Sequence, residues 1–350
     1  MFSSFYLNGQ DWVNYYMTFF EDVHSSWFEP GFYLYFKLLS FVTFYNFGLT
    51  IIVFYVIAFI LLINILRRLT RVNVPLFLIL LVLYFGNTLV LEQLRQFYAA
   101  IFSLYSFYYY VNGEKNKFLL FVLLSISFHI SAIVLCLSFL VIYHKNTLSF
   151  TVTSLVSVGL ILLLFVFPNI VLPALSFFPQ LAIKLTQYLE ITALGFHLGP
   201  SFIFAFLALF YYLSNTKKMS PSLNANWFIH RQIFIGILVF ILGLYVPFAT
   251  RFSVYYILLI FLYTSTIRYT GERKLSFIKS RLLYVMLIFV FVSSNIMSYY
   301  KNEIAPIKFR QLDMHLLSFI SNEIDYGQLA KDIYRRSYED LKDYKDSQGK

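Results

Sequence analysis

The chain has 350 residues, of which 59% are hydrophobic and 13% charged, with a net charge of +10 at pH 7 and a mean hydropathy of +0.71. An ordinary soluble domain has about 25% charged residues, so this composition excludes a soluble globular fold and indicates that lipid faces much of the surface. Backbone amides need internal partners in hydrocarbon, and the apolar runs are long and unbroken. The sequence therefore predicts an all-α polytopic membrane protein.

Nine apolar segments approach the length of about 20 residues that a membrane span needs. They are 47–66, 73–91, 94–111, 118–142, 147–167, 191–213, 228–248, 252–268 and 281–297. Segment 31–45 is shorter, and we expect an interfacial or re-entrant helix there, within an extracytoplasmic region 1–45. We expect about nine to ten transmembrane helices with re-entrant segments.

Two regions outside these segments complete the predicted organisation. Residues 168–190 are expected to form a long extracytoplasmic loop. A membrane catalytic domain over residues 1–300 is followed by a polar, partly helical tail over 301–350. That tail carries nine acidic and nine basic residues, so the positive charge belongs to the membrane domain.

Basic residues gather in the short turns between apolar runs. They are Arg67, Arg68, Arg71, Lys115, Lys117, Lys217, Lys218, Arg268, Arg273 and Lys274. This distribution is typical of cytoplasmic loops under the positive-inside rule, and it favours a membrane protein over a nucleic-acid-binding one. Cys136 is the single cysteine, which excludes an internal disulfide framework and a cysteine metal site.

The basic turns do not decide how segment 118–142 is placed in the membrane. If Arg67 and Lys115 are cytoplasmic, a single crossing by 118–142 gives the wrong parity at the later basic turns. One alternative is a helical hairpin or re-entrant pair over 118–142, with His129 near its tip. The other is a crossing by the proline-rich residues 168–185. The hairpin is the preferred alternative.

The chain lacks the motifs by which soluble enzymes bind nucleotides and metals. It has no G-x-G-x-x-G, P-loop, H-E-x-x-H or D-x-D, and the absence of D-x-D argues against a metal-dependent sugar-nucleotide transferase. The candidates are therefore polar residues within or beside apolar runs, where such residues are costly.

Two groups of candidates come early in the chain. Asp11, Asn14 and Tyr15 share one face if their segment is helical, and Glu29 follows in the same region. The alternative for this group is a solvated loop. In the second group, Glu92, Arg95 and Gln96 lie on one helical face between two apolar runs. An arginine at a bilayer boundary often only extends its side chain to the interface. The stretch 92–96, however, has more polar side chains than a turn between two spans requires, which favours a functional role.

Two further candidates lie later in the chain. His129 interrupts an apolar stretch, and an imidazole can accept or donate protons near neutrality, although a buried histidine is more often a packing residue. Arg251 and Tyr255 are i, i+4 neighbours, and the alternative here is an aromatic-belt tyrosine beside a snorkelling arginine.

These motifs, taken in order, resemble the EpsG family, whose members include Wzy-type O-antigen, capsule and exopolysaccharide polymerases. The matching stretches are Leu94-Arg95-Gln96-Phe97-Tyr98-Ala99-Ala100, Lys115-Asn116-Lys117-Phe118 and Phe128-His129-Ile130-Ser131-Ala132, with Asp11 to Phe32 similar to a first outer loop and Arg251 to Tyr255 similar to a late Arg-aromatic element. Members usually carry a transmembrane helix before that outer loop, whereas here the loop begins close to Met1.

The resemblance implies a glycosyltransferase C-like membrane enzyme in the bacterial inner membrane, with its active site facing the periplasm. Such polymerases transfer an oligosaccharide en bloc from undecaprenyl pyrophosphate to the non-reducing end of a second lipid-linked unit. The implied reaction inverts the anomeric carbon and needs no metal and no cofactor. The implied partners are the two lipid-linked oligosaccharides, the lipid bilayer and a chain-length regulator protein, with no nucleic acid.

The resemblance also implies roles for the candidate residues. Arg95 and Arg251 would bind the pyrophosphate, and one of His129, Asp11 and Glu29 would accept the proton of the acceptor hydroxyl. Contacts with the glycan and its pyrophosphate would fall to Gln96, Glu92, Asn14, Tyr15 and Tyr255.

Two other classes of protein compete with this interpretation. A flippase or transporter of lipid-linked glycans would show more spans and paired structural repeats. Another lipid-dependent glycosyltransferase or an acyltransferase would carry similar polar residues.

Overall fold

A computed structural model describes residues 11–20, 28–69, 72–86, 89–90, 93–144, 146–166, 226–245, 250–265 and 327. Within these ranges every element is a helix, as the composition predicts. The predicted spans 191–213 and 281–297, the loop 168–190 and, apart from Gly327, the tail 301–350 lie outside the described residues.

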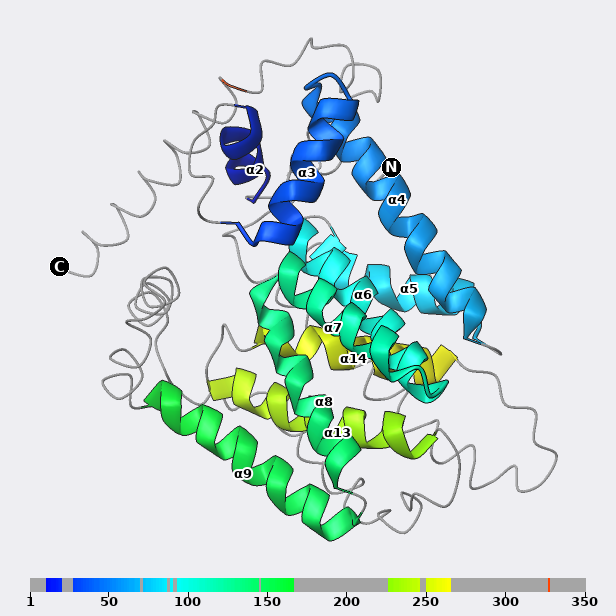
Figure 1. Ribbon diagram of the computed structural model, residues 1–350, viewed down its shortest axis with the longest axis vertical. Helices are drawn as coiled ribbons and strands as arrows, with labels where there is room; N and C mark the ends of the chain where they lie inside the picture. The colour runs from blue at the N-terminus through cyan, green and yellow to red at the C-terminus, as the bar shows by residue number, and fades with distance from the viewer. Residues whose placement is uncertain are drawn as a thin grey trace.

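The helices follow one another in the order shown in Figure 1. They are α2 (Asp11–Phe20), α3 (Pro30–Val42), α4 (Phe47–Arg68), α5 (Val74–Phe85), α6 (Leu94–Val111), α7 (Lys115–Phe128), the 3₁₀ helix η4 (Ile130–Leu137), α8 (Ser138–Tyr143), α9 (Thr147–Val166), α13 (Asn226–Tyr245) and α14 (Thr250–Ser265).

Local signals account for the ends of the first long helices. Pro30 occupies the first position of α3, where its missing N–H costs nothing. Asn46 caps α4 by accepting a hydrogen bond of 2.9 Å from the Leu49 N–H. Arg67 and Arg68 lie in the last turn of α4, where cations interact favourably with the helix dipole.

Among the described residues, α4 is the one helix that is both long and apolar enough to cross a membrane alone. Shorter apolar helical stretches are Ile130–Tyr143, Thr147–Leu162, His230–Gly243 and Arg251–Leu262. The predicted spans 73–91 and 118–142 are not continuous α-helices, because α5 ends at Phe85 and α7 ends at Phe128.

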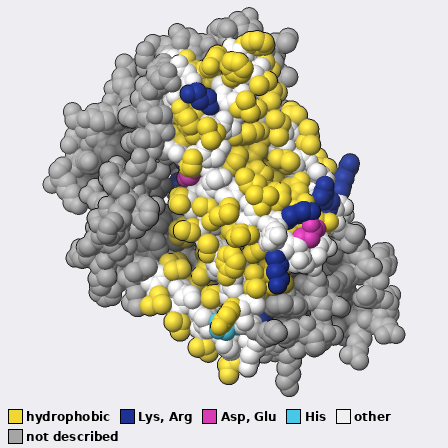
Figure 2. Space-filling view, viewed as in Figure 1, with side chains coloured by type: hydrophobic (Ala, Val, Ile, Leu, Met, Phe, Trp, Pro, Cys, Tyr) yellow, Lys and Arg dark blue, Asp and Glu magenta, His cyan; other side chains and the backbone are white. Residues whose placement is uncertain are grey.

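Large apolar side chains cover much of the outer surface. Figure 2 shows hydrophobic side chains spread over the visible described surface, with lysines and arginines gathered mainly at one side. Exposed members of this surface are Leu34, Leu38, Phe41, Ile60, Leu123 and Leu160. Apolar faces of this extent need a cover other than water, as expected for a protein in lipid.

Contacts of Tyr109 and Tyr110 bring the basic turns to one end of the helices. The Arg68 guanidinium donates to the Tyr109 hydroxyl at 3.4 Å, and the Lys117 ammonium lies 5.1 Å from the centre of the Tyr109 ring. Tyr110 stacks on Phe228, with ring centres 4.0 Å apart. The end of α4, the α6–α7 turn and the start of α13 therefore lie together, and we call this region the basic end.

Segment 115–143 folds back on itself at His129. The backbone of His129 is extended (φ −154°, ψ 123°), which ends α7 and separates it from η4. Phe118 in α7 and Phe139 in α8 have ring centres 5.7 Å apart, which a continuous helix would not allow. The described residues thus contain the helical hairpin of the first alternative, with His129 at its tip. The rival crossing by 168–185 lies outside the described residues.

Arg231 of α13 ties the far end of this hairpin to the basic end. Its guanidinium donates to the His144 carbonyl, which caps the C-terminus of α8. It also lies 4.8 Å from the centre of the Phe150 ring. The neighbouring Gln232 accepts a hydrogen bond of 2.9 Å from the Ser138 hydroxyl. Since α13 begins beside Tyr110, residue 144 returns to the basic end.

Aromatic rings fill the space between α3, α4, α6 and α7. Tyr98 stacks on Phe128 with ring centres 5.5 Å apart and lies 4.4 Å from the Phe54 ring. Its hydroxyl donates to the Phe54 carbonyl at 2.9 Å and bonds the Tyr35 hydroxyl at 2.7 Å. Buried tyrosines of this kind combine large apolar contact with a satisfied hydroxyl. This aromatic layer therefore holds α3, α4, α6 and α7 together.

Candidate active site

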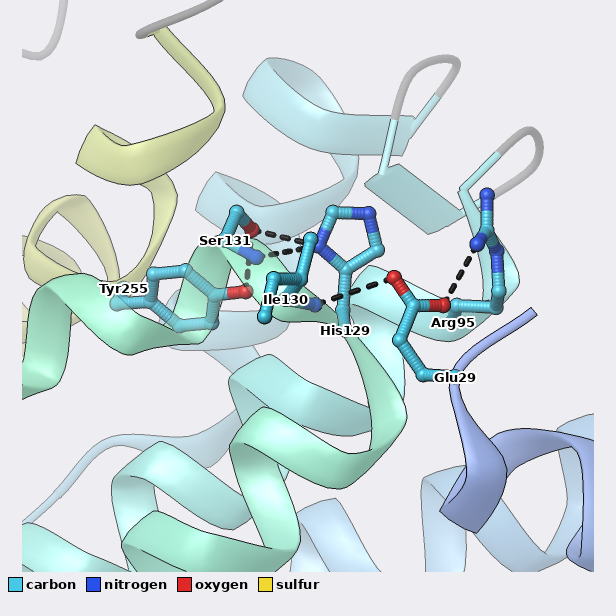
Figure 3. Close-up of polar contacts among 6 residues, drawn as sticks. All are labelled: Glu29, Arg95, His129, Ile130, Ser131 and Tyr255. Atoms are coloured by element: carbon cyan, nitrogen blue, oxygen red, sulfur yellow. Dashed lines mark hydrogen bonds and ion pairs between the residues drawn. The ribbon is translucent and has the colours of Figure 1, made fainter. Parts of the chain in front are cut away.

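Three ionisable side chains meet at the helix ends opposite the basic end (Figure 3). Glu29 immediately precedes α3, Arg95 lies in the first turn of α6, and His129 is the tip of the hairpin. They come from distant parts of the chain, and the fold brings them into one cluster, as their positions at the predicted outer ends of spans lead us to expect.

Glu29 and Arg95 form a close ion pair. A guanidinium nitrogen, Nη1, lies 2.6 Å from Glu29 Oε2, and the two side chains are only 10% and 20% exposed. The other carboxylate oxygen accepts the Ile130 N–H at 3.2 Å. The guanidinium also lies 4.8 Å from the centre of the Phe28 ring. A charge-assisted hydrogen bond and a cation–π contact thus hold Arg95 in place.

Opposing effects set the pKa of Glu29. Burial disfavours the carboxylate and by itself raises the pKa. The Arg95 guanidinium and the hydrogen bond from Ile130 favour the carboxylate, and together they hold the pKa below its ordinary value of 4.5. Glu29 is therefore a carboxylate at neutral pH, with Arg95 compensating its charge.

His129 begins a chain of hydrogen bonds that reaches α14. Its Nδ1 accepts the main-chain N–H of Ser131 at 3.2 Å and lies 2.6 Å from the Ser131 hydroxyl oxygen. That hydroxyl bonds the Tyr255 hydroxyl at 2.8 Å. All three side chains are buried. The chain therefore fixes the orientation of the imidazole ring.

Gly31 lets the segment with Glu29 approach the hairpin. A Cβ at this position would lie 2.8 Å from the Ser127 Cβ and 2.9 Å from the Ser127 carbonyl oxygen, closer than real Cβ contacts. The start of α3 consequently packs directly against the end of α7. Glu29 reaches the Ile130 N–H because of this close approach.

Gln96 and Tyr256 attach α14 to the same region. The Gln96 amide nitrogen donates to the Arg251 carbonyl at 2.5 Å, and Gln96 is fully buried. The Tyr256 hydroxyl donates to the Val134 carbonyl of η4 at 2.9 Å. The backbone of Arg251 thus lies beside α6, and its side chain is partly exposed. Its binding of pyrophosphate stays a prediction.

The first candidate group does not present one shared face to this cluster. Segment 11–20 is helical, as one alternative predicts, but Asn14 is exposed whereas Tyr15 is buried. Tyr15 lies against the rings of Phe28, Phe32 and Phe36, with centres 5.5, 5.5 and 6.0 Å away. Its side chain is therefore part of the aromatic core.

Two other predicted site residues cannot be placed by their side chains. The Asp11 side chain and all of Glu92 lie outside the described residues. Their predicted roles, as a base for Asp11 and in substrate binding for Glu92, stay predictions.

Two residues that contact the cluster have no role predicted from the sequence. Ser131 links His129 to Tyr255 by hydrogen bonds, and the ring of Phe28 packs against the guanidinium of Arg95. Ser131 stands two positions after His129, and a serine so placed can bond the imidazole locally. For Phe28 the sequence offers no comparable signal, because it is one of 42 phenylalanines.

The cluster offers a carboxylate that accepts a proton, a guanidinium that binds an oxyanion and an imidazole held by its Nδ1. Within the described part of the chain no group of three or more histidine, cysteine, aspartate or glutamate side chains is placed to hold a metal ion. The chemistry these three groups support is displacement of an anionic leaving group by a hydroxyl.

The model of the EpsG family matches residues 1–309. Neither the comparison with curated proteins nor that with solved structures found a match.

Proposed function

Because the chain belongs to the EpsG family, we propose that it is a surface-polysaccharide polymerase that joins undecaprenyl-pyrophosphate-linked oligosaccharides, as in O-antigen or exopolysaccharide synthesis. Family membership makes it a membrane protein of polysaccharide biosynthesis, with a polymerase activity of the glycosyltransferase type. The donor, the acceptor and the residues that carry the reaction are our proposal.

The observation that carries the proposal is the buried cluster of Glu29, Arg95 and His129. A guanidinium binds phosphate oxygens through two parallel N–H groups, so Arg95 suits the pyrophosphate of the donor. To bind it, Arg95 must give up part of its contact with Glu29. Binding of the donor would then release the Glu29 carboxylate to accept a new hydrogen bond.

The proposed reaction is a single displacement. The acceptor hydroxyl oxygen attacks the anomeric carbon of the donor, and the bond from that carbon to the pyrophosphate oxygen breaks. The electron pair stays on undecaprenyl pyrophosphate, where Arg95 and Arg251 stabilise the charge. The hydroxyl proton passes to Glu29. Attack opposite the leaving group inverts the anomeric carbon.

We also propose that the Glu29 end faces the periplasm and the basic end faces the cytoplasm of a bacterial inner membrane. The separation of Arg68 and Lys117 from the Glu29 cluster, at opposite ends of the same helices, supports this orientation under the positive-inside rule.

The proposal is tested by analysing the surface glycan of a deletion strain that carries the gene for the wild-type chain or a variant. Without the protein, we expect lipid A core with a single repeat unit, and long chains return with the wild type. Arg95→Ala and Arg251→Ala should still insert in the membrane but give no long chains. Arg68→Ala, at the basic end, is the matched control and should restore them.

Other outcomes would point to other functions. Loss of every glycan-bearing form in the deletion strain would indicate a flippase. Long chains that lack only a side branch or an acetyl group would indicate another transferase. Full activity of both Arg95→Ala and Arg251→Ala would contradict the role given to the arginines.

A further inference from the structure

The hydrogen bonds of His129 define which of its ring nitrogens carries a proton. A main-chain N–H can only donate, so Nδ1 must accept where it meets the Ser131 N–H at 3.2 Å. In a neutral imidazole one nitrogen accepts and the other donates. The proton of neutral His129 therefore lies on Nε2.

Ser131 and Tyr255 strengthen this arrangement. With Nδ1 as acceptor, the Ser131 hydroxyl donates to it over 2.6 Å and accepts from the Tyr255 hydroxyl over 2.8 Å. The two hydroxyl contacts and the main-chain N–H contact then all donate in the direction of Nδ1. A proton on Nδ1 would instead face the buried Ser131 N–H, and two opposed donors in a buried site are costly.

Charges on the other side of the ring act against each other. The Glu29 carboxylate, which precedes α3, favours a protonated imidazole, whereas the Arg95 guanidinium of α6 opposes it. The two groups are paired at 2.6 Å, so their charges oppose each other at the ring. The hydrogen bonds accepted by Nδ1 favour the neutral imidazole.

Nε2 is directed to the opposite side of the ring from Ser131. Figure 3 shows the ring of His129 between Ser131 and the Glu29–Arg95 pair, with its Nδ1 edge toward Ser131. The N–H on Nε2 therefore lies on the edge of the ring turned away from Ser131, on the side of Arg95 (Figure 3).

We propose that Tyr255 and Ser131 hold His129 neutral with its proton on Nε2, so that His129 donates this hydrogen bond to the donor's pyrophosphate beside Arg95 and is not the base. This inference rests on the proposed function for the identity of the ligand. The bond strengthens as negative charge collects on the departing pyrophosphate. No proton leaves His129 in the step, since the hydroxyl proton passes to Glu29. Ser131 and Tyr255 are positioning residues.

The protonation state can be read directly by ¹⁵N NMR. The protein is labelled with ¹⁵N-histidine, placed in lipid nanodiscs at neutral pH, and the signal of His129 among the six histidines is assigned by its loss in His129→Gln. We expect a protonated Nε2 and an unprotonated Nδ1. A proton on Nδ1, or on both nitrogens, would overturn the proposal.

The ligand is tested in the same sample with inorganic pyrophosphate. Its addition should shift the Nε2 resonance of His129, and Arg95→Ala should abolish that shift while leaving the proton on Nε2. An unchanged Nε2 resonance at saturating pyrophosphate would overturn the donor role. These spectra do not depend on polymer synthesis, so the proposed polymerase could fail in the deletion strain while the pyrophosphate contact stands.

Glycan assays of variants separate a hydrogen-bond donor from a base. The amide of His129→Gln can still donate, so it should keep more long-chain glycan than His129→Ala, whose synthesis rate should fall about 100-fold, as for loss of one donor to a developing oxyanion. Ser131→Ala leaves the main-chain N–H in place and should reduce the rate only several-fold. Equal inactivity of His129→Gln and His129→Ala, in proteins whose ¹⁵N spectra show the fold intact, would overturn the proposal.

Discussion

At the scale of the residue, Glu29 carries the most constrained charge in the cluster. It is paired with Arg95 at 2.6 Å, bonded to the Ile130 N–H and nearly buried. Removing one partner of a buried ion pair leaves the other charge uncompensated, which costs about 3 kcal/mol in typical cases. Because both side chains keep some exposure to solvent, we expect about 2 kcal/mol for Glu29→Gln.

The lowered pKa of Glu29 predicts how this stabilisation depends on pH. A carboxylate whose pKa is lower in the folded state stabilises the protein above its unfolded pKa, near 4.5, and loses that effect as the pH falls through the folded pKa. In detergent, the melting temperature of the wild type should exceed that of Glu29→Gln at pH 7, and the gap should close well below pH 4.5.

The control for this measurement is Glu114→Gln. Glu114 pairs with Lys117 at 2.5 Å, but the two side chains are 41% and 55% exposed, and such surface pairs contribute little. Its melting temperature should equal that of the wild type at every pH. A gap for Glu29→Gln that stays constant from pH 7 to pH 3 would show that the ion pair is not its source.

The sequence indicates which residues belong to the cluster, but it does not indicate which residues they contact. Glu29, Arg95 and His129 are recognisable because polar residues beside apolar runs are costly. Their contacts join positions 66 and 101 residues apart, and no local pattern reports such distances. The burial of Tyr15 among aromatic rings could not be read from the sequence for a related reason, since helical spacing defines a face but not what that face packs against. Its predicted contact with the substrate stays a prediction.

At the scale of the element, the site depends on how closely α3 packs on α7. Gly31→Ala would place its Cβ within 3.0 Å of both the Cβ and the carbonyl oxygen of Ser127. Backbone atoms cannot give way as a flexible side chain can. We therefore expect α3 to move outward, a lower melting temperature and less long-chain glycan, because Glu29 then loses the Ile130 N–H.

Gly159→Ala provides the matched control. Gly159 lies in α9, and a Cβ there meets no atom within 4 Å. Replacing a helical glycine with alanine stabilises by about 0.5–1 kcal/mol where there is space, so this variant should melt at the same or a higher temperature and keep its activity. If Gly31→Ala behaves in the same way, the close approach does not position Glu29.

The break at His129 shows that a hydrophobic pattern does not report where a helix is interrupted. Residues 118–142 form one apolar run, so the run alone does not report the break at Phe128. The parity of the basic turns is inconsistent with a single crossing and favours a hairpin, but it does not exclude a crossing by residues 168–185. The distribution of charge thus reports an inconsistency that hydropathy does not.

At the scale of the whole molecule, two ends of different chemistry are separated by apolar helices. Arg68 and Lys117 meet around Tyr109 at one end, and Glu29, Arg95 and His129 meet at the other. Composition predicts the class of fold, because lipid-facing surface requires it. The order of contacts between helices follows from side-chain fit, which composition does not encode.

Labelling of single cysteines tests this arrangement in cells. In a Cys136→Ala background, a membrane-impermeant maleimide should label Phe44→Cys, at the exposed turn between α3 and α4, from outside the inner membrane. Asn116→Cys and Asn146→Cys should react only after permeabilisation. The last two flank the hairpin, so a single crossing would put them on opposite sides, and labelling of Asn146→Cys from outside would contradict the hairpin.

The hairpin also limits where related chains can gain or lose residues. Its arms are α7, with 14 residues, and η4 with α8, with 8 and 6 residues. Inserting one residue in either arm would rotate the positions beyond it by about 100° in an α-helix or about 120° in the 3₁₀ helix, so the hairpin would lose its register with α6 and α14. The exposed turn at Asn112 and Gly113, where the glycine has φ +80°, can absorb an insertion without this rotation. Gaps and insertions in related chains should therefore fall in that turn and avoid the arms.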